Sequence, residues 1–297
     1  MTEITRQGWR AACEAALGSA IARLDALGGG DSAQSFRASL EDGRVLFVKT
    51  HADPPPGFFS TESNGLRWLR EAGTIAVPEV LFASDEPPCL ALAWIETVRG
   101  TSGRRGRGGA DGEAAFGRAL AALHGSGAPG FGREDGCPTG SLAVPNEPAP
   151  DWPSFYAERR LLPLARIASE RDALPAETVA QLERVAGRLG EFGASEEPPA
   201  RLHGDLWAGN RMIDAAGRSW LIDPAAHGGH REFDLAMMRL FGGFDERCHA
   251  AYREATPLAP GWEARVPLHQ LAPLAVHAIK FGGGYVRATR DALARLL

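Results

Sequence analysis

Apolar and polar positions follow two different patterns along this chain, and the change falls near residue 96. The first part alternates in short runs typical of strands, with one longer stretch in which Leu66 and Leu69 share a helical stripe. The turn Glu41-Asp42-Gly43 separates two of these runs and predicts a hairpin. The predicted elements are strands over 35–40, 44–50, 79–83 and 89–95 and a helix over 59–72. We therefore expect a small lobe of mixed strands and helix over residues 1–96.

Beyond residue 96 most apolar positions recur at helical spacing, as Phe116, Leu120 and Leu123 do. A stretch rich in Gly and Pro, residues 125–153, predicts a long irregular loop. The predicted elements are helices starting near 116 and 231 and over 155–170, 176–192, 268–281 and 286–297, with short strands over 211–213 and 219–222. The whole pattern predicts an α+β protein of two lobes, the second larger and mainly helical over residues 97–297.

Composition narrows the class of protein. Of the 297 residues, 44% are hydrophobic and 23% are charged, which is ordinary for a soluble globular protein. The formal net charge of −5 argues against a nucleic-acid partner, because nucleic acids are met by basic surfaces. The four cysteines form no C-x-x-C pair, and the chain shows neither a signal-peptide core nor an 18-residue apolar run. We expect a cytoplasmic protein with reduced thiols and no membrane segment, and we interpret the basic run Arg104-Arg105-Gly106-Arg107 as a solvated loop.

The densest chemistry lies between residues 203 and 223. Asp205 precedes Asn210 by five residues, the spacing at which protein kinases place a catalytic aspartate and a metal-binding asparagine. Asp223 follows 18 residues after Asp205, at the end of an apolar strand. Carboxylate and amide oxygens suit Mg²⁺, and phosphoryl transfer requires little beyond positioning and charge neutralisation. A three-letter match alone would carry little weight, but the joint spacing predicts ATP-dependent phosphoryl transfer with Asp205 as base and Asn210 and Asp223 as metal ligands.

A lysine and a glutamate in the first lobe complete the expected nucleotide site. Lys49 ends an apolar strand and shares a face with Val45 and Phe47, because side chains alternate along a strand. Glu62 lies on the stripe of Leu66 and Leu69, which turns its carboxylate inward. A buried carboxylate needs a partner, and Lys49 is the nearest candidate. Such a pair is how a kinase aims its lysine at the ATP phosphates.

Two further segments are candidates for nucleotide contacts. Residues 28–32, with Gly29 and Gly30, would form a phosphate-covering loop, although they do not match G-x-G-x-x-G. Ala93, Trp94 and Ile95 stand where adenine would meet backbone groups between the lobes. A plain buried strand explains the second segment equally well.

The residues at this point resemble those of a known family, the fructosamine or ketosamine kinases. The family belongs to the aminoglycoside phosphotransferase-like branch of the protein-kinase-like fold. The likeness covers nearly the whole chain, and its most specific motifs are His203-Gly-Asp-Leu-Trp-x-Gly-Asn210, Leu221-Ile-Asp-Pro-Ala225, Gly229-His-Arg-Glu-x-Asp-Leu-Ala-Met237 and Leu240-Phe-Gly-Gly-Phe244.

The resemblance implies a substrate and further site residues. It implies that a sugar–amine adduct is phosphorylated on a sugar hydroxyl, giving an unstable product that releases the free amine, which is deglycation. Trp207 separates this pattern from aminoglycoside and choline kinases and would line the substrate pocket. His277 is interpreted first as a core or cap histidine, but it precedes Phe281-Gly282 and is a candidate for the wall of the same pocket. His203 and Asp234 would support the catalytic loop, whereas His124 is interpreted as a core or cap histidine.

Departures from the family pattern limit the prediction. Gly-Gly-Gly-Asp at 28–31 replaces a loop that often carries cysteine, so no thiol-based control is expected there. Ala93 stands where glutamate is common, and Pro224 predicts a stiff metal-binding loop because proline fixes φ. A kinase for another small alcohol, such as an aminoglycoside or choline, and a nucleotide-binding pseudokinase are the alternatives. Both a free metabolite and a glycated lysine on protein are candidate substrates.

Overall fold

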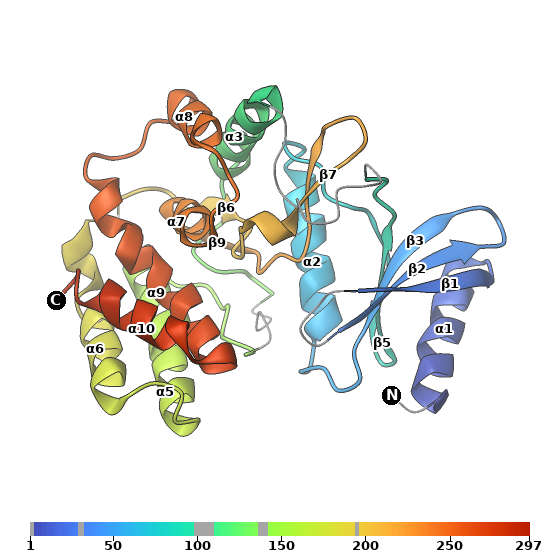
Figure 1. Cartoon of the computed structure of the whole chain (residues 1–297), viewed down its shortest axis with the longest axis horizontal. Helices are drawn as coiled ribbons and strands as arrows, with labels where there is room; N and C mark the ends of the chain where they lie inside the picture. Colours follow the sequence, from blue (N-terminus) through green and yellow to red (C-terminus); the bar gives the residue numbers. More distant parts are fainter. Residues whose placement is uncertain (1–2, 29–32, 98–109, 136–141, 194–195) are drawn as a thin grey trace.

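The structure is a computed structural model that describes residues 3–28, 33–97, 110–135, 142–193 and 196–297 (Figure 1). It consists of an antiparallel five-stranded sheet with two helices beside it, followed by a mostly helical part. This confirms the two-lobed α+β fold. The Arg- and Gly-rich run at 104–107 and the phosphate-loop glycines Gly29 and Gly30 lie outside the described residues.

The sheet of the first lobe has the strand order β1-β2-β3-β5-β4. Its strands are β1 (Ile21–Leu27), β2 (Gln34–Leu40), β3 (Val45–Thr50), β4 (Val80–Asp85) and β5 (Pro88–Ala93). One face, with Phe36 and Val48, packs against helix α1 (Glu3–Leu17) through Trp9 and Cys13. Because Ser35 pairs with Lys49 and side chains alternate, Lys49 points to the opposite face.

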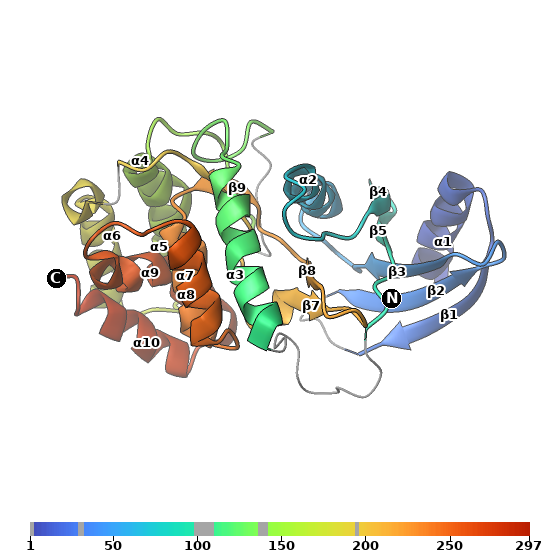
Figure 2. The same ribbon diagram turned by 90° about the horizontal axis from the view of Figure 1, so that it is seen from above.

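Helix α2 (Phe58–Glu71) stands between the sheet and the helical lobe in two perpendicular views (Figures 1 and 2). Its bounds agree with the predicted helix. Glu62, Leu66 and Leu69 are all buried, as the helical stripe indicated.

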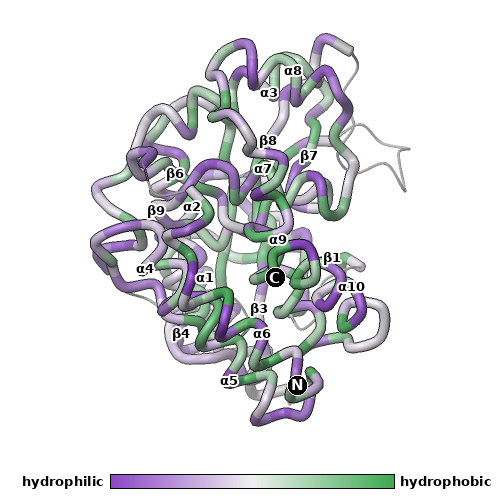
Figure 3. The backbone as a smooth tube through the Cα atoms, turned by 90° about the vertical axis from the view of Figure 1, so that its left-hand side faces the viewer, coloured by the Kyte–Doolittle hydropathy of each residue, from purple (hydrophilic) through white to green (hydrophobic). Residues whose placement is uncertain are grey.

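The second lobe contains helices and two antiparallel pairs of three-residue strands. Its helices are α3 (Ala110–Gly125), α4 (Trp152–Tyr156), the π-helical turn η1 (Ala157–Leu161), α5 (Leu162–Glu170), α6 (Ala176–Ala186), the 3₁₀ turn η2 (Leu189–Phe192), α7 (Glu232–Phe241), α8 (Glu246–Ala255), α9 (Trp262–Phe281) and α10 (Gly284–Leu293). Its strands are β6 (Ala200–Leu202) paired with β9 (His227–Gly229) and β7 (Arg211–Ile213) paired with β8 (Ser219–Leu221), and the 3₁₀ turn η3 (Ala208–Asn210) precedes β7. Hydropathy changes over short distances along the backbone tube, as expected for elements with one buried side (Figure 3).

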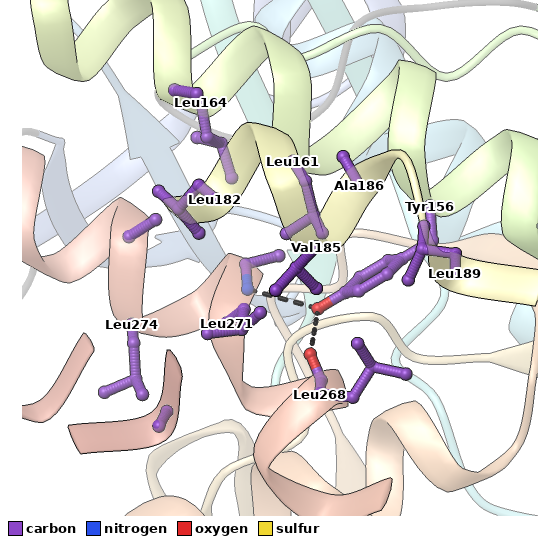
Figure 4. Packing of buried hydrophobic residues seen from close by; sticks show 14 of the residues in the cluster. Tyr156, Leu161, Leu164, Leu182, Val185, Ala186, Leu189, Leu268, Leu271 and Leu274 are labelled. Atoms are coloured by element: carbon purple, nitrogen blue, oxygen red, sulfur yellow. Dashed lines mark hydrogen bonds between the residues drawn. The ribbon is translucent and has the colours of Figure 1, made fainter. Parts of the chain in front are cut away.

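Helix α9 runs through two prolines, and a tyrosine compensates for one of them. Pro273 has no N–H to donate to the carbonyl of His269, four residues earlier. The hydroxyl of Tyr156 lies against this break and donates to the carbonyl oxygens of Leu268 and His269, at 2.9 and 3.2 Å, and accepts the Ala272 N–H at 3.1 Å (Figure 4). The sequence predicted this helix only from residue 268, whereas it begins at Trp262.

The apolar side chains form three buried clusters. One fills the space between α4–α6, α9 and α10, and another lies between α1 and the sheet. The remaining cluster crosses between the lobes, because Leu66 and Leu69 of α2 share it with Leu120 of α3, Leu206 and Met238. Of the helices in the described ranges, none has the length and apolar character needed to cross a membrane.

Candidate active site

The loop between β6 and β7 brings Asp205 and Asn210 into direct contact. The Asn210 side-chain amide donates to the Asp205 carboxylate at 3.0 Å and to the Asp205 carbonyl oxygen at 2.9 Å. The same amide nitrogen lies 3.4 Å from the carbonyl oxygen of Asp223. Its Oδ1 accepts no hydrogen bond from the part of the chain that the structure describes. Asn210 therefore links the two aspartates through its nitrogen and presents its oxygen as a free ligand.

Asp223 holds an unusual backbone conformation. Its φ of 52° lies in the left-handed region, which non-glycine residues rarely adopt. The chain on either side is fixed, since Ile222 N–H donates to the Asn210 carbonyl at 3.0 Å and Pro224 follows. Strain of this kind gathers at functional sites, where the surrounding structure enforces it. The conformation aims a carboxylate that is 43% exposed toward the space between the lobes.

Lys49 stands between two carboxylates. Its Nζ lies 3.1 and 2.9 Å from the two oxygens of Glu62, so the ion pair expected from the sequence is present. It also lies 3.1 Å from Oδ1 of Asp223, a contact between the lobes that the sequence did not reveal. Burial alone would lower the pKa of Lys49, but the charges of Glu62 and Asp223 raise it above the usual range of lysine. The ammonium therefore stays charged and joins strand β3, helix α2 and the Asp223 loop.

The pKa of the Asp205 carboxyl is raised toward neutral pH. Burial raises its pKa to about 7, and the negative charges of Asp223 and Asp234 add to this rise. The hydrogen bond from Asn210 and the positive charge of Lys280 oppose it. A general base is most useful when its pKa lies near the working pH. Asp205 therefore has the acidity of a group that accepts and returns a proton near pH 7.

His203 and Asp234 fix the backbone of the loop that carries Asp205. Asp234 is fully buried, and its two oxygens accept the backbone N–H groups of His203 and Gly204 at 2.8 and 2.9 Å. His203 accepts the Asp205 N–H on Nδ1 at 3.2 Å and donates from Nε2 to the Ile222 carbonyl at 2.9 Å. Burial lowers the pKa of His203, in agreement with this neutral form. The histidine thus ties the Asp205 loop to the strand that precedes Asp223.

His124 belongs to the same network, although the sequence indicated only a core or cap role for it. Its Nε2 lies 3.3 Å from the Asp234 carboxylate and its Nδ1 lies 2.8 Å from the Tyr252 hydroxyl. Burial alone would raise the pKa of Asp234, but the hydrogen bonds from His124 and Gly204 keep it below the usual range. The only hint in the sequence was a histidine at the end of a predicted helix. Nothing in the pattern connected it with a residue 110 positions later.

Trp207 and His277 lie in one row of aromatic rings. Trp207, 40% exposed, meets Phe241 with ring centroids 6.2 Å apart, and Phe241 meets His277 at 4.8 Å. His277 in turn lies 5.6 Å from Phe281, which is 50% exposed, and 5.0 Å from Tyr285. The row starts in the catalytic loop and ends in solvent at the start of α10. The sequence assigned none of Phe241, Phe281 and Tyr285 to the site, although Phe241 belongs to the motif Leu240-Phe-Gly-Gly-Phe244.

The segment expected beside adenine is only partly free to bind it. The backbone N–H of Ala93 donates to the Glu79 carbonyl at 2.9 Å, and that of Trp94 donates to the Val45 carbonyl at 3.3 Å. Within the described residues, the backbone N–H of Ile95 meets no acceptor. Of the three residues, Ile95 therefore retains the donor that an adenine ring needs.

Comparisons with known proteins identify the family of this chain. Residues 6–297 match the family described as fructosamine kinase. The chain belongs to that family. Its members are kinases, so the phosphotransferase class predicted from the sequence is confirmed, and such kinases use ATP as phosphate donor.

Several relatives of this fructosamine kinase family member match most of the present chain. A "Probable ketoamine kinase" of Enterococcus faecium is 35% identical over 86% of this chain and 89% of its own. The "Protein-ribulosamine 3-kinase, chloroplastic" of Arabidopsis thaliana is 33% identical over 89% of this chain and 79% of its own. A crystal structure named "putative fructosamine-3-kinase" from Thermobifida fusca superposes with a TM-score of 0.86 at 39% identity, over 96% of this chain and 97% of the other.

Proposed function

We propose that this protein transfers the terminal phosphate of magnesium-bound ATP to a sugar hydroxyl of a ketosamine. The observation that supports this best is the Asn210 amide, which links Asp205 to the Asp223 segment beside the Lys49–Glu62 pair. Phosphoryl transfer requires a base, metal ligands and a cation for the phosphates within one small volume. These five side chains supply all of them, and the family and its named relatives supply the substrate class.

The residues present fit a magnesium ion. Mg²⁺ prefers oxygen ligands from one or two carboxylates and leaves its other positions to water and phosphate. The exposed Asp223 carboxylate and the amide oxygen of Asn210 are donors of this kind. When bound, the ion neutralises negative charge on the phosphates. We assign Asn210 and Asp223 to hold it.

The remaining roles follow from charge and position. Lys49, kept charged by Glu62 and Asp223, binds the phosphates through its ammonium group, and Ile95 donates its backbone N–H to adenine. Asp205 accepts the proton of the attacking hydroxyl, because its pKa near 7 lets it exchange a proton at neutral pH. His203 and Asp234 hold the loop that carries Asp205. Phosphate-loop roles for Gly29 and Gly30 and backbone contacts from Ala93 and Trp94 remain part of the proposal.

The aromatic row suits the substrate. Trp207 and His277 provide ring faces for the sugar beside Asp205, and the exposed Phe281 lies farther out, where the amine part would leave the pocket. A phosphate on the sugar makes the adduct unstable and releases the free amine. The protein would therefore repair glycated amines, a reaction that suits the cytoplasm because ATP is supplied there.

A phosphorus NMR assay tests this proposal. The protein is incubated with ATP, Mg²⁺ and one acceptor at a time: fructosamine, ribulosamine and erythrulosamine adducts of lysine, a glycated protein, an aminoglycoside and choline. We expect a new phosphomonoester signal with at least one ketosamine, dependent on Mg²⁺ and absent with Asp205→Asn. Phosphorylation of only choline or the aminoglycoside would replace the proposed substrate class, and ATP binding without any product would show a binding module.

A further inference from the structure

Helix α2 is attached at its first turn to the sheet. Gly57 at its N-cap has no side chain to accept the first N–H groups. Asp85 at the end of β4 does so instead, since its Oδ1 accepts from Phe59 N–H at 2.9 Å and Ser60 N–H at 3.3 Å. The first lobe therefore holds the start of the helix that carries Glu62.

The last turn of α2 is attached to the helical lobe through Trp68. The guanidinium of Arg201, on β6, lies 4.7 Å from the centre of the Trp68 ring, and its Nη1 donates to the Trp68 carbonyl oxygen. The guanidinium of Arg133 lies 5.9 Å from the centre of the same ring. Arg201 also lies 3.9 Å from the Glu71 carboxylate. A cation within about 6 Å of an indole ring is attracted to it, and arginine stays charged at every working pH.

Between these two ends, α2 approaches the loop that follows Asp223. A Cβ placed on Gly65 would lie 3.3 Å from the Ala226 Cβ, 3.4 Å from Pro224 and 3.4 Å from the Arg133 guanidinium. Such spacing is tighter than most Cβ contacts, so a larger residue at position 65 would require its neighbours to move by a few tenths of an ångström. Because a helix is stiff, attaching Trp68 and Gly65 to the helical lobe also fixes Glu62 relative to Asp223.

We propose that Trp68 is a positioning residue, and that its two arginine contacts hold α2 so that Lys49 meets Glu62 and Asp223 before nucleotide binds. The inference rests on the proposed function of Lys49 as the phosphate-binding cation. Removing the indole lets the end of α2 shift against the helical lobe. Glu62 then moves with it, and Lys49 loses its aim at the phosphates.

Trp68→Ala and Trp68→Phe test this. Positional errors of about 1 Å in reacting groups cost up to about a hundredfold in rate, so we expect Trp68→Ala to raise the KM for Mg-ATP about tenfold and to lower kcat. The KM for the ketosamine should change less than about twofold, because the acceptor meets the other lobe. Trp68→Phe keeps a ring between the arginines and should recover most of the loss. Calorimetric Kd values for a non-hydrolysable ATP analogue with Mg²⁺ should follow the same order.

Two further variants keep the result interpretable. Arg201→Met removes the nearer cation but leaves Trp68, and should weaken nucleotide binding even if Trp68→Ala does not fold. Arg239→Met is the matched control, because Arg239 of α7 lies 4.1 Å from the centre of the Trp262 ring of α9, a cation–ring contact between two helices of the second lobe. Folded Trp68→Ala and Arg201→Met with wild-type nucleotide Kd values would overturn the proposal, as would an equal loss in Arg239→Met. The Kd needs no acceptor, so failure of the ketosamine assay alone would refute the proposed function and leave this inference standing.

Discussion

Three carboxylates and one ammonium meet at the centre of the site. Glu62 and Asp223 both contact Lys49, and Asp205 is joined to the same group through Asn210. Negative charge is therefore in excess, and it adds to the effect of burial, which is the main cause of the raised pKa of Asp205. A bound divalent cation offsets this excess.

The substitution Asp205→Asn should affect catalysis and stability in opposite directions, because the proposed base also destabilises the folded protein when it is charged. The raised pKa means that the folded protein binds a proton more readily than the unfolded chain, so this group lowers stability as pH rises through about 7. We expect Asp205→Asn to lower kcat at least about a hundredfold and to raise the melting temperature at pH 8. At pH 4, where the folded carboxyl is already protonated, the increase in melting temperature should disappear. A gain that is equal at both pH values would contradict the assigned pKa.

The same group sets the pH dependence of the reaction. Because Asp205 accepts a proton only in its charged form, kcat/KM should rise with pH through about 7 and then level off. Steady-state rates between pH 5.5 and about 9 at saturating Mg²⁺ measure this. A profile that is flat across this range would assign proton acceptance to another group.

For single residues, the sequence predicted those whose roles depend on local spacing or on a motif. Asp205 with Asn210 and Glu62 with Leu66 are of that kind. It missed the contact between Lys49 and Asp223, 174 residues apart, and the place of His124 beside Asp234. No periodic pattern connects such positions, because only the folded chain brings them together.

Among the elements, the segment after Asp223 is held by contacts on two sides. Pro224 fixes one φ angle, the Ala226 carbonyl accepts from Asn146 at 3.3 Å, and the Ala225 carbonyl accepts from His227 at 2.8 Å. Gly65 of α2 closes the other side. Protein kinases regulate the corresponding segment by moving it, whereas here the contacts favour a single conformation.

Hydrogen exchange measures this stiffness. We expect the amides of Ile222 and Gly228 to exchange slowly, both with and without Mg-nucleotide, because they donate to the carbonyls of Asn210 and Gly132 at 3.0 and 2.9 Å. Pro224→Gly, which frees φ, should speed exchange there, while amides in α10 keep their rates. Fast exchange at these amides in the wild-type complex would show a mobile loop.

Elements with a strong stripe or clean alternation were predicted almost to the residue, as α2 and β3 show. Helix α1 and strand β1 were missed. Among the described side chains of α1, only Trp9 and Cys13 are buried, so its apolar stripe is short, and a bulge between Ile21 and Arg23 interrupts the alternation of β1. Helix α8 was also missed, because its sequence is largely polar. Residues 262–267 of α9 were missed because Pro267 follows them and indicates a helix boundary.

Over the whole molecule, the two lobes share a hydrophobic cluster. Leu66 and Leu69 of α2 pack in it with Leu120, Leu206 and Met238 of the helical lobe. The limits 1–96 and 97–297 remain a prediction from the change in pattern. The shared core means that the helix carrying Glu62 packs with both parts.

This arrangement predicts cooperative unfolding. Leu66 is fully buried, so Leu66→Ala should lower the free energy of unfolding by about 2–5 kcal/mol while leaving one transition for the whole chain. Urea unfolding followed by tryptophan fluorescence and by circular dichroism measures this. Two separated transitions, with only the first shifted by the substitution, would show that the lobes unfold independently.

The central proposal is that Asn210 and Asp223 bind one divalent ion next to Asp205. A crystal grown with Mn²⁺ and a non-hydrolysable ATP analogue, measured at the manganese absorption edge, locates that ion directly. We expect an anomalous peak at a manganese ion whose ligands are the Asn210 amide oxygen, an Asp223 carboxylate oxygen and phosphate oxygens, with Asp205 facing the terminal phosphate. A nucleotide-bound crystal in which the manganese peak lies away from both side chains would contradict it.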